Sequence, residues 1–165
     1  DDLMVGPADG QPVLAQMADA FESLGRSVLA VQQVPADQVR RYGIVAGTPA
    51  GERLISIERI VEKPAPEQAP SRMGVAGRYI LTPRIFHEIR QQPPGAGGEI
   101  QLTDAIALLL EQEEVYGYVF DEGRYDIGQK LDYLRASVEL AVDRDDIGAE
   151  FRSFLAEFVA RKGIV

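Results

Sequence analysis

Carboxylates near both ends of the chain could bind a divalent metal ion together. Asp1 and Asp2 precede the apolar residues 3–5, and Asp126 precedes Ile127-Gly128 and a predicted helix. If Asp1 and Asp2 follow a strand, they lie at its carboxyl end, where α/β sheets bind ligands. Carboxylate oxygens are the hard ligands that suit Mg²⁺. The alternatives are a solvated loop at Asp1-Asp2 and a turn or helix-cap aspartate at Asp126.

The segment Glu62-Lys63-Pro64 places an acid and a base side by side. Because Lys63 precedes a proline, we expect its backbone to be extended, which would fix the direction of its side chain. Glu62 would then point to the opposite side of the strand, unless the strand bends there. A lysine is a compact point charge suited to phosphate, and a carboxylate can accept two sugar hydroxyls. The alternative is a surface ion pair at a strand end.

Other polar segments carry weaker signals. The glycine-rich residues 95–99 lack the Lys-Ser/Thr of a P-loop, and a loop at the rim of a pocket is the better interpretation. Thr103 and Asp104 could cap the helix that follows them. A glycine at position 43 could let a ligand approach the backbone closely, or could simply end a turn. His87 is the only histidine, and we expect it to be exposed and not catalytic.

Apolar periodicity predicts the elements that position these residues. The run at 27–31 is continuously apolar, which is typical of a strand buried on both faces. The long β-rich stretch from 43 to 81 favours a mixed sheet. Strands that alternate with helices predict an α/β fold. The expected strands are 27–31, 43–45, 54–61, 75–81 and 116–120; the expected helices are 12–24, 82–89, 102–110, 129–142 and 147–159.

Composition excludes several classes of function. The chain has 165 residues, a net charge of −9 and no cysteine. Disulfides and cysteine-bound metals are therefore excluded, and a reducing, cytoplasmic location is expected. No apolar stretch approaches the roughly 20 residues of a membrane span, and the acidic balance argues against nucleic-acid binding. We expect residues 1–165 to be one part of a single domain whose start is absent.

The last predicted helix carries an unusually wide apolar stripe. Six large apolar residues fall within it: Ile147, Phe151, Phe154, Leu155, Phe158 and Val159. Such a stripe is either part of a core or the interface of an oligomer. A homo-oligomer is the expectation, and a non-catalytic assembly module is one of the alternatives for the function of the chain.

Taken in order, several segments resemble bacterial UTP–glucose-1-phosphate uridylyltransferases. The resemblance covers nearly the whole chain and corresponds to the C-terminal part of a family member. The string from Pro93 to Asp104 is its most specific segment. The matching segments are Tyr42-Gly-Ile-Val45, Val61-Glu-Lys-Pro64, Ala69-Pro-Ser71, Val75-Ala-Gly-Arg-Tyr-Ile80, Pro93-Pro-Gly-Ala-Gly-Gly-Glu-Ile-Gln-Leu-Thr-Asp104, Tyr125-Asp-Ile-Gly-Gln-Lys130 and Gly148-Ala-Glu-Phe151.

The resemblance implies a partial Rossmann-like nucleotidyltransferase fold, with a mixed β-sheet flanked by helices. It also implies catalytic roles. Asp1 and Asp126 match the two aspartates that bind Mg²⁺ in the family. Lys63 matches the lysine that holds the sugar phosphate, and Glu62 matches the acid that binds glucose hydroxyls. Mg²⁺ is the only cofactor that the resemblance implies.

Further substrate-binding positions follow from the same resemblance. Gly43 and Gly77 match glycines that line the sugar pocket. Glu99 and Thr103 match a segment at its rim, and Lys130 matches a position near the phosphates.

The function that the resemblance implies is the formation of UDP-glucose and pyrophosphate from UTP and glucose-1-phosphate. The family's N-terminal glycine-rich loop, which wraps the nucleotide, is not in this sequence. We therefore expect the longer protein to be an enzyme and this chain alone not to be competent. The alternatives are a related transferase for another nucleotide or hexose phosphate, and a glycosyltransferase that uses a nucleotide sugar.

Overall fold

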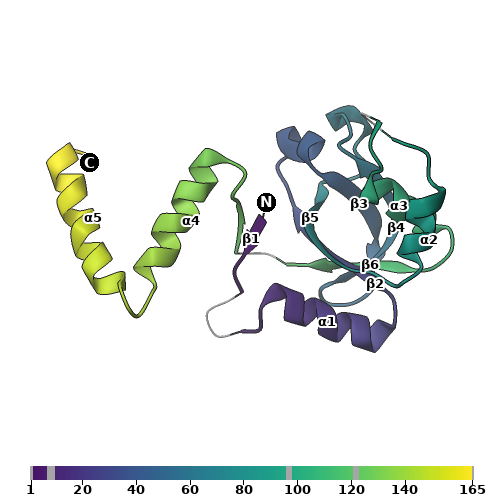
Figure 1. Cartoon of the computed structure of the whole chain (residues 1–165), viewed down its shortest axis with the longest axis horizontal. Coiled ribbons are helices and arrows are strands. Elements are labelled where there is room, and N and C mark those ends of the chain that lie inside the picture. The colour runs from purple at the N-terminus through teal and green to yellow at the C-terminus, as the bar shows by residue number, and fades with distance from the viewer. Residues whose placement is uncertain (1, 7–9, 96–97, 121–122, 165) are drawn as a thin grey trace. The chain divides into compact units, whose positions relative to one another are not determined.

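The computed structural model describes residues 2–6, 10–95, 98–120 and 123–164, which form two compact units. Residues 5–123 make up one of them, called here the β-rich unit, and residues 1–4 and 124–165 make up the other, called here the hairpin unit. Both are drawn in Figure 1. None of the described helices is both long and apolar enough to cross a membrane.

Five strands form the sheet of the β-rich unit. Its order is β2-β5-β3-β4-β6, and β6 also pairs with β2, so the sheet closes on itself. The β2–β6 pair is parallel and the other pairs are antiparallel, which confirms the predicted mixed sheet. The strands are β2 (Ser27–Gln33), β3 (Gly43–Pro49), β4 (Leu54–Glu62), β5 (Met73–Ile80) and β6 (Val115–Val119).

Strand β2 lies at the centre of this unit, and its two faces pack against different helices. Leu29 and Val31 belong to the cluster that contains residues of α2 (Ile85–Gln91) and α3 (Leu102–Leu110). Ala30 points to the other face, because its register partner Tyr118 donates a hydrogen bond to Gln16 of α1 (Val13–Leu24) at 2.5 Å. All residues from Ser27 to Val31 are buried, which confirms the prediction of a strand covered on both faces.

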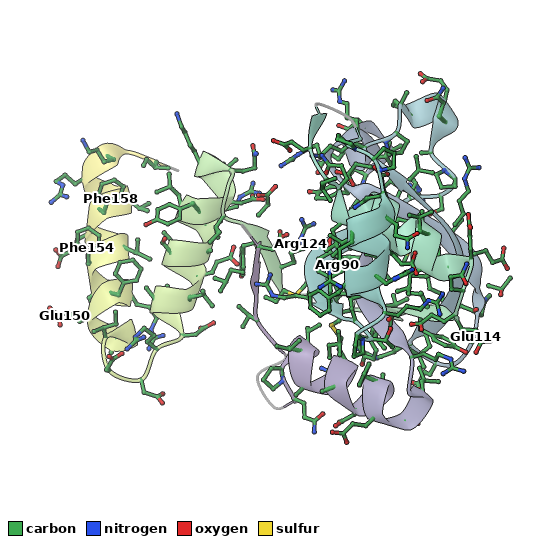
Figure 2. The ribbon with its side chains drawn as sticks, turned by 45° about the vertical axis from the view of Figure 1, so that its right-hand side comes forward. Arg90, Glu114, Arg124, Glu150, Phe154 and Phe158 are labelled. Atoms are coloured by element: carbon green, nitrogen blue, oxygen red, sulfur yellow. The ribbon has the colours of Figure 1, made fainter. Side chains whose placement is uncertain are left out.

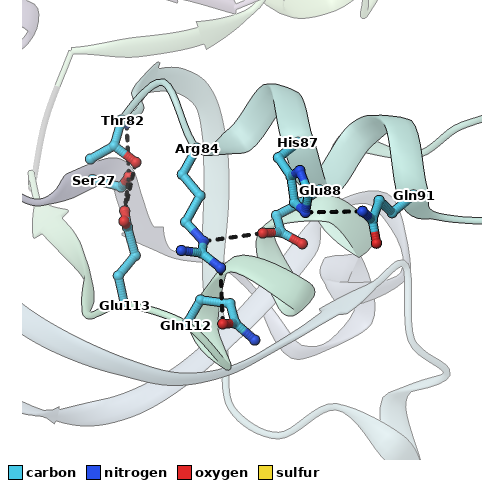
Figure 3. Close-up of polar contacts among 8 residues, drawn as sticks. All are labelled: Ser27, Thr82, Arg84, His87, Glu88, Gln91, Gln112 and Glu113. Carbon is cyan, nitrogen blue, oxygen red and sulfur yellow. Dashed lines mark hydrogen bonds and ion pairs between the residues drawn. The ribbon is translucent and has the colours of Figure 1, made fainter.

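Helix α2 begins later than its sequence suggests. The predicted start was Thr82-Pro83, whereas the helix begins at Ile85. The Thr82 N–H donates to the buried hydroxyl of Ser27 (3.0 Å), and the Thr82 hydroxyl donates to Glu113 Oε1 (2.7 Å). Figure 3 shows these contacts, which hold Thr82 in the turn before the helix. His87, on the same helix, is exposed as predicted.

The two ends of the β-rich unit lie side by side. The Val5 N–H donates to the carbonyl of Gly123 at 2.6 Å. Gly123 has φ +81°, and a Cβ at this position would lie 1.9 Å from the Val5 carbonyl oxygen. A glycine is therefore required where the chain leaves the unit. Two short 3₁₀ helices, η1 (Ala36–Arg41) and η2 (Pro66–Gln68), complete the unit.

The hairpin unit contains two strands that the sequence did not predict. Strands β1 (Asp2–Met4) and β7 (Arg124–Asp126) pair antiparallel, with Asp2 opposite Asp126. Helices α4 (Lys130–Val142) and α5 (Gly148–Lys162) follow, close to their predicted bounds. Each strand has only three residues, which is too short for an alternating pattern to stand out.

Candidate functional site

The β-rich unit brings together a cluster of predicted site residues from three elements. Gly43 begins β3 and lies opposite Glu62, the last residue of β4. Thr103 lies in the first turn of α3, which packs on β4. Lys63 follows directly after β4. We call Gly43, Glu62, Lys63 and Thr103 the Glu62 cluster.

The carboxylate of Glu62 is held from two sides. Thr103 Oγ1 donates a hydrogen bond to Glu62 Oε2 at 2.6 Å, a distance typical of a charge-assisted hydroxyl–carboxylate pair. Lys63 Nζ lies 3.3 Å from Glu62 Oε1. The Glu62 side chain is 19% exposed and that of Lys63 is 61% exposed. The lysine therefore stays accessible to a ligand, while the carboxylate is fixed at the edge of the core.

The prediction that the backbone of Lys63 is extended is wrong. Lys63 has φ +42° and is the one non-glycine residue with positive φ in the described part of the chain. Its N–H donates to the Tyr42 carbonyl at 3.0 Å, which prolongs the β3–β4 pairing by one bond. The left-handed turn brings the lysine side chain back beside Glu62 instead of across the strand. A non-glycine residue held in this region is a strained position of the kind found at ligand sites.

Gly43 leaves room beside the carboxylate. A Cβ at this position would lie 3.3 Å from Thr103 Oγ1 and 3.4 Å from Glu62 Oε2. The Thr103 hydroxyl would have to shift by a few tenths of an ångström to accept it, whereas the Glu62 oxygen would be in ordinary van der Waals contact. Of the two interpretations of this glycine, close approach to the backbone therefore has a geometric basis.

Among the described residues, no hydrogen bond or ion pair links Gly77 or Glu99 to the Glu62 cluster. Gly77 has φ +66° and lies at an irregularity of the β2–β5 pairing, between the Leu29 and Val31 pairs. This bulge explains the glycine by itself. Glu99 is exposed, and its carbonyl accepts a hydrogen bond from the Gly95 N–H at 2.8 Å. Their predicted roles in sugar binding stay predictions.

In the hairpin unit, Asp126 ends β7 and does not cap a helix. The first helical residue of α4 is Lys130 and the capping position is Gln129, with no side-chain cap. The Gln129 N–H donates to the Asp126 carbonyl at 2.8 Å and closes the turn between strand and helix. Asp1 lies outside the described residues. Among the described residues, no group of three or more histidine, cysteine, aspartate or glutamate side chains could hold a metal.

The residue adjacent to Asp1 has a partner of its own. Asp2 Oδ1 accepts hydrogen bonds from Arg124 at 2.7 Å through both Nε and Nη2, and both side chains are largely buried. Asp2, Arg124 and Asp126 share one face of the strand pair, because their positions alternate with those of Leu3 and Tyr125. Sequence reasoning missed Arg124, whose alternation with Asp126 was the available signal.

Tyr125 connects β7 with the helix that follows. Its hydroxyl donates to Glu139 Oε2 at 2.6 Å, and this hydrogen bond raises the pKa of Tyr125 above its ordinary value. Lys130 opens the same helix and is exposed. It lines an open groove of about 410 Å³ together with Ile127, Gly128, Tyr133 and Leu134.

Comparison with known proteins bears on the whole chain. The profile of the family described as Nucleotidyl transferase matches residues 5–142. The chain belongs to the nucleotidyl transferase family. The predicted α/β nucleotidyltransferase fold with a mixed sheet is thereby confirmed.

Relatives within the nucleotidyl transferases are uridylyltransferases. The UTP–glucose-1-phosphate uridylyltransferase of Streptococcus pneumoniae is 41% identical over 161 residues, which cover 95% of this chain and 53% of that protein. The enzyme of the same name from Staphylococcus epidermidis is 37% identical over 146 residues, covering 88% and 51%. The crystal structure of a UDP-glucose pyrophosphorylase complexed with UDP-glucose matches with a TM-score of 0.82 at 36% identity, covering 87% of this chain and 54% of that chain.

The resemblance inferred from the sequence is therefore confirmed. The chain spans about half the length of the curated relatives that it matches.

The backbone strain at Lys63 of this nucleotidyl transferase can be measured as a difference in the free energy of unfolding between two variants. Lys63→Gly and Lys63→Ala both remove the amine, but only alanine keeps a Cβ in the left-handed region. We expect the glycine variant to have the higher free energy of unfolding, by about 1 kcal/mol, because a Cβ is disfavoured there. Urea unfolding would measure the difference. Arg59, an exposed residue within β4, is the control. There the order should reverse, since glycine weakens a strand; the same order at both positions would refute strain at Lys63.

Proposed function

We propose that this chain supplies the sugar-phosphate-binding part of a UTP–glucose-1-phosphate uridylyltransferase. The observation that carries the proposal is the Glu62 cluster, in which an oriented carboxylate and an accessible lysine stand 3.3 Å apart. The identity of 37–41% to uridylyltransferases over most of the chain supports the same assignment.

Glu62 and Lys63 have complementary roles in this proposal. A carboxylate oxygen has two acceptor positions. Glu62 Oε2 can therefore keep the hydrogen bond from Thr103 and still accept a sugar hydroxyl, while Oε1 accepts a second one. Lys63 binds the phosphate at the anomeric carbon. The ion pair between the two side chains holds the lysine near the site until a phosphate competes for it.

The remaining predicted site residues stay within this proposal. Asp1 and Asp126 would hold Mg²⁺, and their carboxylates are suitable hard donors. Asp126 ends β7, opposite Asp2, whose carboxylate is paired with Arg124. Bound Mg²⁺ would neutralise phosphate charge in the transition state. Gly43 and Gly77 would line the sugar pocket, Glu99 and Thr103 its rim, and Lys130 would lie near the phosphates.

The reaction is an in-line displacement at phosphorus. An oxygen of the glucose-1-phosphate phosphate attacks the α-phosphorus of UTP and forms the new P–O–P bond. The bond to the bridging oxygen breaks, and pyrophosphate leaves with that electron pair. No covalent intermediate on the protein is required. The contribution of this chain is to position the nucleophile, while the nucleotide-binding loop would come from residues that are not among these 165.

A transferase for another nucleotide or another hexose phosphate is the second candidate. The resemblance assigns the base-reading residues to a part of the family that this sequence lacks. Specificity for UTP therefore rests on the similarity to uridylyltransferases alone. A cytoplasmic location stays a prediction, and the absence of cysteine supports it.

Pyrophosphate release tests the proposal. The 165-residue chain and the longer protein that contains it would be assayed with UTP, glucose-1-phosphate and Mg²⁺. We expect release from the longer protein only. In that protein Lys63→Ala should lower kcat/KM for glucose-1-phosphate by roughly 10- to 100-fold, because a hydrogen bond to a charged group contributes about 1.5–3 kcal/mol. The KM for UTP should change little. Equal losses for both substrates would contradict the phosphate-binding role of Lys63, and no release would contradict the activity.

Asp126 offers a separate test of the metal site. Asp126→Asn keeps the size of the side chain and removes the charge that attracts Mg²⁺. Turnover of the longer protein should fall by more than about a hundredfold, since even the mutation of residues that only hydrogen-bond to metal ligands lowers activity 10- to 100-fold. Asp132→Asn, on the helix that follows, is the control and should keep normal turnover. An Asp126→Asn enzyme with an unchanged dependence on Mg²⁺ concentration would assign Asp126 to the strand–helix turn alone.

We propose further that the hairpin unit binds a second copy of the chain. Large apolar side chains of α4 and α5 are exposed, among them Leu131, Leu134 and Phe154. Phe151, Phe154 and Phe158 form a ladder along α5 with ring centroids 6.0 Å apart, and Figure 2 labels two of them. The first turn of α5 is acidic at Glu150 and the last is basic at Arg161 and Lys162. Two antiparallel copies of α5 would therefore match opposite charges around an apolar centre.

Light scattering after size exclusion would measure this association. Phe154→Ser should shift the chain from dimer to monomer, because the side chain is 49% exposed and would lie in the interface. Phe86→Ser is the matched control, since Phe86 is 61% exposed on α2 in the β-rich unit and should leave the mass unchanged. A monomeric unsubstituted chain, or an unchanged dimer for Phe154→Ser, would contradict the proposed interface.

A further inference from the structure

Thr103 uses its hydroxyl in a way that the sequence did not suggest. The residue was expected either to cap α3 or to contact the sugar. Helix α3 begins at Leu102 with Gln101 at the capping position and no side-chain cap. Thr103 thus lies inside the first turn, and its hydroxyl donates to Glu62 Oε2 across 41 positions of sequence. Of the two contacts recorded for the Glu62 carboxylate, this one at 2.6 Å is shorter than the 3.3 Å ion pair with Lys63.

Thr103 stands on a rigid support. Ala105, Ile106 and Leu109 of α3 are fully buried in the cluster that includes Ile57 and Ile60 of β4. The start of the helix is fixed as well. The buried Gln92 side chain donates to the Gln101 carbonyl at 3.1 Å. The backbone that carries Thr103 therefore cannot shift without disturbing the core, which is a condition for holding another side chain in place.

Among the residues that the structure describes, Glu62 has one further polar contact besides Thr103. It shares a face of β4 with the buried Ile60, two residues before it, but it lies where the strand ends and the core stops. Its second partner, Lys63, has a side chain that is 61% exposed. An exposed ion pair of this kind is weak and contributes little to orientation. The direction of the carboxylate therefore depends on Thr103.

We propose that Thr103 is a positioning residue that aims the Glu62 carboxylate at two neighbouring hydroxyls of the sugar, and that it does not bind the substrate itself. This inference rests on the proposed sugar-phosphate site. With Oε2 fixed by one hydrogen bond, each oxygen keeps an acceptor position, and the two positions are set at a constant spacing. Loss of the Thr103 hydroxyl leaves the carboxylate chemically intact but free to rotate, so each binding event must order it again.

The test measures binding of glucose-1-phosphate to the 165-residue chain by NMR titration, which also quantifies weak binding. Thr103→Val removes the hydroxyl at constant size and should weaken binding by up to about tenfold, because each binding event must then order the freed carboxylate. Thr103→Ser should restore affinity to within about twofold, since the donor is back. In a chain that already carries Glu62→Ala, adding Thr103→Val should change affinity by less than about twofold, because there is no carboxylate left to orient.

Thr82 provides a matched control. Its hydroxyl also donates to a carboxylate, Glu113 Oε1 at 2.7 Å, and it lies in the same unit but outside the Glu62 cluster (Figure 3). Thr82→Val should leave affinity for glucose-1-phosphate unchanged, whatever it does to the melting temperature.

Several results would overturn the inference. Equal affinity of Thr103→Val and the unsubstituted chain would mean that the hydrogen bond is only structural, as would an equal loss in Thr82→Val. A full tenfold loss in the Glu62→Ala background would mean that Thr103 contacts the substrate directly. If the unsubstituted chain does not bind glucose-1-phosphate, the sugar-phosphate site fails together with this inference. If that chain binds but Thr103→Val has no effect, only the positioning role fails.

Discussion

The packing of α3 on β4 is the interaction on which the Glu62 cluster depends. Ile106 and Leu109 are fully buried against the apolar row of β4, and the same arrangement continues past the end of the core to Thr103 and Glu62. Burial of each large aliphatic side chain contributes about 1.5–3 kcal/mol, so the two together contribute more than the single hydrogen bond to the carboxylate, which is also about 1.5–3 kcal/mol. The core thus determines the distance between α3 and β4. That distance also sets the separation of Thr103 and Glu62 at the edge of the core. The geometry of the Glu62 cluster therefore follows from apolar packing.

The backbone of Lys63, at the same edge of the sheet, is strained. Lys63 adopts a positive φ although it precedes a proline and carries a Cβ, and the chain thereby returns its amine to Glu62. A regular strand would have sent the two side chains to opposite faces. The neighbouring glycine at position 43 leaves space in front of the carboxylate. The turn at Lys63 and the missing side chain at position 43 therefore act on the same carboxylate, one by placing a charge beside it and the other by leaving space.

Sequence reasoning found most of this fold and part of this site. The strand that contains Ser27–Gln33 was predicted because five consecutive buried residues leave a long apolar run. Strands β1 and β7 were missed because three residues carry no periodicity, and the closure of the sheet because it depends on β6 pairing with both β2 and β4. Glu62, Lys63, Gly43 and Thr103 were singled out from their residue types and positions, and the family resemblance then implied their roles. The contacts of these residues could not be predicted from the sequence. The hydrogen bond from Thr103 joins distant segments, and the positive φ of Lys63 departs from the extended backbone that is usual before proline.

The hydrogen bond between Val5 and Gly123 has a consequence for the order in which the chain folds. Strands β1 and β7 are joined by an ion pair across 122 positions, a separation that makes direct pairing slow. Once the β-rich unit has formed, however, Val5 and Gly123 at its two ends are joined by a hydrogen bond with an N···O distance of 2.6 Å. The residues between β1 and β7 then no longer form an open loop. The pairing of β1 with β7 then becomes a local event. In topological terms the β-rich unit is an insertion between the two paired strands β1 and β7, and its folding shortens the loop that their pairing must close.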